Sequence, residues 1–193
     1  MPKEFLSFLT EVAPLNETIQ TDFLHKLKLI RVPQGKILLS EGEICDKLWF
    51  IKAGLARGCY HIDRGAGRTD EVTEWFAREN DFFHAFESFV NEVPSRECIE
   101  TLEASTLIYI TRADLYYLYA KYPEVCNLGR IIAERHWLLH KEKLREMRLH
   151  SASERLDIFH QQSRDLFLRV PQKYIASYLG ISENYVSKLK ARF

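Results

Sequence analysis

The sequence contains no apolar stretch close to the ~18–20 residues that a membrane-spanning helix requires. Its first 15 residues, MPKEFLSFLTEVAPL, lack the basic start of a secretory signal and are interrupted by Glu4 and Glu11. It has no low-complexity tract and no internal repeat. These absences predict a cytoplasmic chain with no membrane partner. Its 46% of hydrophobic residues suffice for a packed core.

Cysteine is scarce, and its positions are scattered. Cys45, Cys59, Cys98 and Cys126 form no CxxC pair. This spacing excludes a disulfide framework, a structural zinc site and a cysteine-bound iron–sulfur centre. We interpret the four as free thiols, mostly buried.

Catalytic and metal motifs are missing as well. HWLLH at 136–140 places two histidines four residues apart, but no third ligand accompanies them. RGAG at 64–67 lies between predicted strands and lacks the GK[ST] of a phosphate-binding loop, so it indicates a hairpin turn. The HxH pair of a cupin-type metalloenzyme, the enzyme alternative for a β-roll, is absent. The sequence therefore predicts no enzyme, no metal and no cofactor.

Charge is balanced overall but unevenly distributed. Residues 1–140 carry 16 basic and 21 acidic side chains, a net −5, whereas residues 141–193 carry 11 and 6, a net +5. Ordinary surface variation would produce such a difference, and so would a basic C-terminal module that binds a polyanion.

Short segments rich in β-branched and aromatic residues fill the first two thirds of the chain. Turn signals separate them, as in a β-sandwich or roll. The predicted strands are LKLIRV, KILL, KLWFIKAG, LARGCYHI, DEVTEWFA, ECIETL and STLIYIT. Residues 81–90, DFFHAFESFV, show helical spacing and predict a short helix between strands.

Capping residues mark three further helices. Asn16 starts one through Phe23, Thr111 with Asp114 starts another through residue 122, and Ser151 with Glu154 starts a third through about residue 163. The longest helical pattern, residues 124–149, has a stripe near a 3.5-residue repeat that predicts a homodimer seam, with packing on its own domain as the alternative. The seam residues are Leu128, Ile131, Ile132, Arg135, Leu138 and Leu139.

Residues 169–193, RVPQKYIASYLGISENYVSKLKARF, have helix–turn–helix spacing. Pro171 suits the first helical position, Gly180 the helix end and Ser182 the next cap. The second helix would enter the major groove, where amide, ammonium and carboxylate groups read base edges. The predicted reading residues are Glu183, Asn184, Tyr185, Ser187, Lys188 and Lys190, and the predicted phosphate contacts are Ser182, Lys173, Tyr174 and Arg192.

Three segments in this order resemble the Crp/Fnr family of transcription regulators. GKILLSEGEICDKLWFIKAGLARGCY resembles the first strands of its cyclic-nucleotide-binding-type domain, TRADLYYLYAKYPE the approach to its dimerisation helix, and RVPQKYIASYLGIS its DNA-binding hairpin. The resemblance implies an α+β fold with a double-stranded β-helix (jelly-roll-like) sensor at 1–123, a dimerisation helix at 124–149 and a helix–turn–helix domain at 150–193. It also implies a homodimer on a roughly palindromic operator, with RNA polymerase as a further partner.

The sequence departs from this family at the nucleotide cassette. His84-Ala85 stands where the family has Gly-Glu, and Ser95-Arg96 where it has Arg-Ser. A one-residue shift in a strand turns a side chain to the opposite face. We therefore expect no useful cAMP binding. Arg96, Phe83 and Phe86 are candidates for lining an effector pocket, with core packing as the alternative for both phenylalanines.

The hairpin is also followed by too few residues for the β-wing that family members commonly carry. We expect a helix–turn–helix domain that lacks a full wing and binds DNA more weakly for it. Two functions follow. The first is a DNA-binding transcription regulator. The alternative is a ligand-sensing or protein-interaction module whose hairpin no longer binds DNA.

Overall fold

The computed structural model describes residues 5, 9, 10, 12–65 and 67–190, which fall into two compact units. Unit 1 comprises residues 1–58 and 76–135, and unit 2 comprises 59–75 and 136–193. This grouping differs from the three consecutive segments expected from the sequence, because residues 59–75 join the C-terminal helices. The long helix α5 (Pro123–Leu149) contributes its first half to unit 1 and its second half to unit 2.

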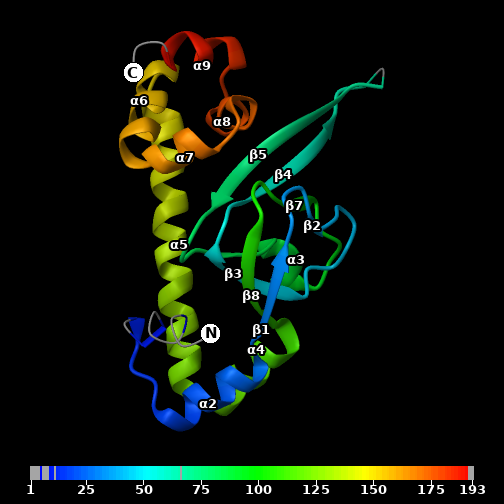
Figure 1. The fold of residues 1–193 in the computed structure, drawn as a ribbon, viewed down its shortest axis with the longest axis vertical. Helices are drawn as coiled ribbons and strands as arrows, with labels where there is room; N and C mark the ends of the chain where they lie inside the picture. The colour runs from blue at the N-terminus through cyan, green and yellow to red at the C-terminus, as the bar shows by residue number, and fades with distance from the viewer. Residues whose placement is uncertain (1–4, 6–8, 11, 66, 191–193) are drawn as a thin grey trace. The chain divides into compact units, whose positions relative to one another are not determined.

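Two four-stranded sheets form the β-roll (Figure 1). One has the order β1-β8-β3-β6 and the other β2-β7-β4-β5, so β5 is an edge strand. Every predicted strand is confirmed. The strands are β1 (Lys28–Val32), β2 (Ile37–Leu39), β3 (Lys47–Ala53), β4 (Ala56–Asp63), β5 (Thr69–Ala77), β6 (Phe82–Phe83), β7 (Glu97–Thr101) and β8 (Ser105–Thr111).

The predicted helix over 81–90 is wrong in its first half. Phe82 and Phe83 form strand β6 and pair antiparallel with Phe50 and Trp49. Helix α3 (Phe86–Asn91) begins only after Ala85 and ends at a left-handed Glu92 with φ 56°. The periodicity of this segment could not reveal β6, because the pairing partner lies about 30 residues away and local spacing carries no record of it.

The pleat of the first sheet separates two apolar faces. Leu48 and Phe50 point to one side of β3 and Trp49 to the other, since side chains alternate along a strand. Trp49 stacks on Phe83, with ring centroids 6.3 Å apart. Phe50 instead contacts Phe82 at 5.1 Å. Each of the two phenylalanines of β6 therefore belongs to a different layer of the core.

The predicted caps of unit 1 are confirmed. The Asn16 side chain accepts a 3.0 Å hydrogen bond from the Ile19 N–H at the start of α2 (Glu17–Lys26). The Thr111 hydroxyl accepts from the Asp114 N–H at 3.2 Å and starts α4 (Arg112–Lys121). Both helices begin where local side-chain chemistry satisfies their first amides.

Unit 2 contains the C-terminal helices, coloured yellow to red in Figure 1. They are α6 (Ala152–Gln162), α7 (Arg164–Arg169), α8 (Gln172–Leu179) and α9 (Glu183–Lys190). The predicted capping box of Ser151 and Glu154 starts α6. Helix α7 was not predicted. Pro171, predicted as the first helical residue, is instead the N-cap of α8, with ψ 139°, and the helix begins at Gln172.

Three of the four free thiols, Cys45, Cys59 and Cys98, are buried, and Cys126 is exposed. Across the part of the chain that the structure describes, no helix is both long and apolar enough to cross a membrane.

Candidate nucleic-acid interface and effector region

The α8–α9 hairpin has helix–turn–helix geometry. Gly180 ends α8 in the left-handed conformation at φ 65°, and the Ile181 N–H donates to the Ala176 carbonyl at 3.0 Å. The Ser182 hydroxyl accepts from the Tyr185 N–H at 3.3 Å and so caps α9. Ile175, Ala176 and Val186 are buried. The two helices therefore share a core across a glycine turn, as the sequence predicts.

The outward side of α9 is polar and accessible. Glu183, Asn184, Ser187 and Lys188 are exposed, whereas Tyr185 is half-buried. Lys190 is the last residue of α9, and Arg192 lies outside the described residues. One short helix thus exposes an amide, a hydroxyl, an ammonium and a carboxylate while it buries Val186.

The predicted phosphate contacts lie at the helix starts. Ser182 is exposed just before α9. Lys173 is exposed in the first turn of α8, with its Nζ 4.5 Å from the centre of the half-buried Tyr174 ring. A hydroxyl, an ammonium and amides at helix N-termini are groups that bind phosphate oxygens.

The predicted dimer seam divides between inward and outward positions. Leu128 is 2% exposed and, with the half-buried Ile132, packs within unit 1. Ile131 is half-buried and Arg135 exposed. Leu138 and Leu139 leave 64% and 69% of their surfaces open to solvent. Within the predicted seam, the most exposed apolar residues therefore lie at the middle of α5.

The three candidate effector residues differ in their exposure. Phe83 is buried against Trp49, Phe86 is 64% exposed at the start of α3, and Arg96 is exposed. Ala85, which stands in the position of the family's glutamate, is buried and contributes no polar side chain.

The β-roll also contains a buried arginine that no sequence pattern predicts. Arg57 on β4 is 1% exposed, and its Nε and Nη2 atoms lie 2.7 and 2.6 Å from Glu100 Oε1 on β7. A buried charge of this kind requires a partner. No local pattern pairs residues 43 positions apart, so the ion pair becomes visible only in the assembled sheet.

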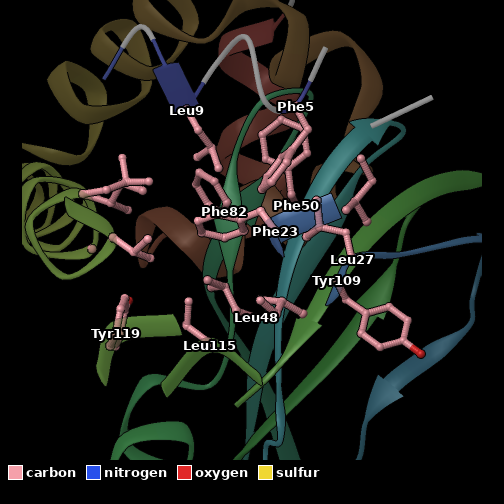
Figure 2. Close-up of a pocket in the computed structure, with 16 residues that line it drawn as sticks. Phe5, Leu9, Phe23, Leu27, Leu48, Phe50, Phe82, Tyr109, Leu115 and Tyr119 are labelled. Carbon is pink, nitrogen blue, oxygen red and sulfur yellow. The ribbon is translucent and has the colours of Figure 1, made fainter. Parts of the chain in front are cut away.

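An apolar cavity of about 40 Å³ lies in unit 1, between the first sheet and helices α2, α4 and α5. Figure 2 shows the rings of Phe5, Phe50 and Phe82 gathered beside it, with Leu48 and Leu115 also at its wall. Its lining carries no charged side chain. An ionic ligand such as a cyclic nucleotide would lose its hydration there without compensation.

Tyr119 of α4 and Gly129 of α5 meet at the wall of this cavity. Burial raises the pKa of the Tyr119 phenol to about 12. A Cβ at Gly129 would lie 2.4 Å from the Tyr119 Oη, so the glycine in mid-helix leaves room for that ring. The single glycine of α5 thus has a packing reason.

Known structures resemble more than nine tenths of the chain. No protein-family model and no curated protein matches the sequence. The c-di-GMP responsive global regulator CLP of Xanthomonas campestris matches with a TM-score of 0.70 at 16% identity, covering 92% of this chain and 93% of CLP. A crp/fnr-family transcriptional regulator of Eubacterium rectale matches with a TM-score of 0.70 at 16% identity, covering 93% and 83%.

The catabolite activator protein of Thermus thermophilus matches with a TM-score of 0.57 at 18% identity, covering 96% of this chain and 85% of that one. All three are named as regulators or activators. The chain has the Crp/Fnr-type fold.

Proposed function

We propose that this protein is a DNA-binding transcription regulator of Crp/Fnr type that acts as a homodimer. The observation that carries the proposal is the α8–α9 hairpin, in which α9 buries Val186 and exposes Asn184, Ser187 and Lys188. A helix fixed on one side and polar on the other is what the major groove accepts.

Each exposed side chain has a distinct task. Asn184 binds adenine through two hydrogen bonds, Lys188 donates to guanine acceptors, and Glu183 accepts from cytosine. Ser182, Lys173 and Tyr174 contact phosphates and set the register of the hairpin on the duplex. The net +5 of residues 141–193 adds sequence-independent attraction.

The homodimer forms through the outward residues of α5. Ile131, Arg135, Leu138 and Leu139 lie within one strip of the helix, as its 3.6-residue period places them. A two-fold axis beside this strip would give two reading helices and a roughly palindromic operator, with half-sites about one turn of DNA apart.

The β-roll does not bind cAMP with useful affinity. Binding requires a carboxylate for the ribose and an inward arginine for the cyclic phosphate. Ala85 supplies no carboxylate, and Arg96 is exposed. Arg57 is buried but already ion-paired with Glu100. Calorimetry with cAMP is expected to detect no binding, and micromolar affinity would contradict this part of the proposal.

The test of DNA recognition is fluorescence anisotropy on labelled DNA from upstream of the gene, against random DNA of equal length, over a salt series. Asn184→Ala should weaken binding to the upstream DNA by roughly 5–150-fold, the ~1–3 kcal/mol of a bidentate base contact, and leave binding to random DNA unchanged. Lys173→Ala should weaken both and reduce the salt slope by ~0.9.

Lys36→Ala is the matched control, because it removes one exposed lysine from a turn of unit 1. It should leave both affinities unchanged. If the wild-type chain binds neither DNA near ~50 mM salt, where phosphate contacts are strong, the protein is not a DNA reader. The ligand-sensing or protein-interaction alternative would then replace it.

A further inference from the structure

A serine of the DNA-binding hairpin bonds to the open edge of a sheet. Within unit 2, the Ser177 hydroxyl on α8 accepts from the Thr73 N–H at 2.8 Å and donates to the Glu71 carbonyl at 3.1 Å. Thr73 and Glu71 lie on β5, the edge strand of its sheet. One residue of a parallel neighbouring strand pairs with the same two backbone groups. The hydroxyl therefore takes the place of a further strand.

A lysine of α5 reaches the same strand. Lys143 Nζ donates to the Glu74 carbonyl and lies 3.8 Å from the ring centre of Tyr178, the neighbour of Ser177 on α8. Burial lowers the pKa of Lys143 to about 8, while the nearby carboxylates of Glu74 and Glu146 oppose that shift. We name these bonds of Ser177 and Lys143 to β5 the α8–β5 contact.

The contact fixes α8 without covering the reading side of α9. Helices α8 and α9 move together because Ile175, Ala176 and Val186 are buried in their shared core. Asn184 and Lys188 remain exposed. An anchor on α8 therefore sets the orientation of α9 and leaves its base-reading side chains accessible.

Serine is a poor choice if α8 needs only to be stable. A serine inside a helix competes for backbone hydrogen bonds, and alanine has the higher helix propensity. Here its hydroxyl satisfies one donor and one acceptor of an edge strand that α8 packs against. The side chain at this position thus serves the contact with β5.

We propose that Ser177 and Lys143 are positioning residues for DNA recognition: through the α8–β5 contact they hold the reading helix α9 in its binding orientation. This inference rests on the proposed function. Without the contact the hairpin samples other orientations, and the apparent operator affinity falls by the fraction of molecules that remain competent. Random DNA, which any orientation can approach, is bound as before.

The first experiment uses the full-length chain without DNA. Residue-resolved hydrogen exchange should show the Thr73 amide exchanging at least ~10-fold faster in Ser177→Ala, the loss that ~1.4 kcal/mol of opening free energy produces. Ser177→Thr, which keeps the hydroxyl, should restore protection. Ser153→Ala, at another half-buried helix serine of unit 2, is the control and should leave Thr73 unchanged. Equal exchange in wild type and Ser177→Ala would mean that the contact does not form.

The second experiment measures operator affinity. Ser177→Ala and Lys143→Met should each weaken operator binding about 5–30-fold with an unchanged salt slope, since no phosphate contact is removed. Ser177→Thr should bind as the wild type does. Faster Thr73 exchange with unchanged operator affinity would overturn the positioning role and leave only protection of the strand edge. If the wild type binds no DNA, the proposed function fails, and the exchange experiment alone still decides whether the contact exists.

Discussion

Leu138→Asp is expected to dissociate the proposed homodimer. The Leu138 side chain is 64% exposed in the single chain, so about two thirds of its burial energy remains available to a partner. Fully burying a leucine contributes ~1.5–3 kcal/mol, and a two-fold interface uses each substitution twice. The loss is therefore roughly 2–4 kcal/mol per dimer, before the cost of placing two carboxylates in the seam. The dimer dissociation constant should rise by about 1.5 to three powers of ten.

Sedimentation equilibrium over a range of chain concentrations measures this constant directly. Trp137→Asp is the matched control: Trp137 is 69% exposed, next in sequence, and about 100° around the helix from Leu138. It should dimerise as the wild type does. Equal dimer constants for wild type and Leu138→Asp would refute the seam, and dissociation by Trp137→Asp alone would place the interface on the other side of α5.

Three further outcomes concern stability and are measured by urea unfolding. Gly54→Ala should destabilise by at least ~2 kcal/mol, because its Cβ would lie 2.8 Å from the Ser105 Cα at a backbone φ of 113°; an unchanged midpoint would contradict this packing. Arg57→Met should cost about 3–5 kcal/mol by leaving Glu100 without its arginine, and adding Glu100→Leu should recover most of it. Stability should rise from pH about 8 to about 10.5, since the pKa of Lys143 is lowered to about 8 from 10.5 and the unfolded chain binds that proton more tightly. Lys143→Met should remove this rise, and a rise that persists in the variant would assign it to another group.

Elements with local signals were predicted correctly. The strands alternate or carry β-branched runs between turn residues, and Ser151 with Glu154 forms the expected capping box. The Gly180 turn and the exposure of Asn184 and Lys188 also follow from spacing within 20 residues. Such signals survive in sequence because the interacting groups are neighbours along the chain.

Non-local pairing decided the rest. Phe82 and Phe83 became a strand because β3 offered them partners, against the helical spacing of their own segment. The inward position of Leu128 and the placement of Arg57 beside Glu100 likewise depended on elements distant in sequence.

By itself, the amino-acid sequence determined the order of the elements, their caps and the polar face of α9. Those features depend on backbone conformations and side chains a few residues apart. Only the tertiary structure decided that α8 meets the edge of β5 through Ser177 and that the half-buried Lys143 lies over the Tyr178 ring. In the sequence, a serine or a lysine that makes such a contact cannot be distinguished from one that is exposed on a helix. What they bond to is set by packing between segments some 70 to 100 residues apart.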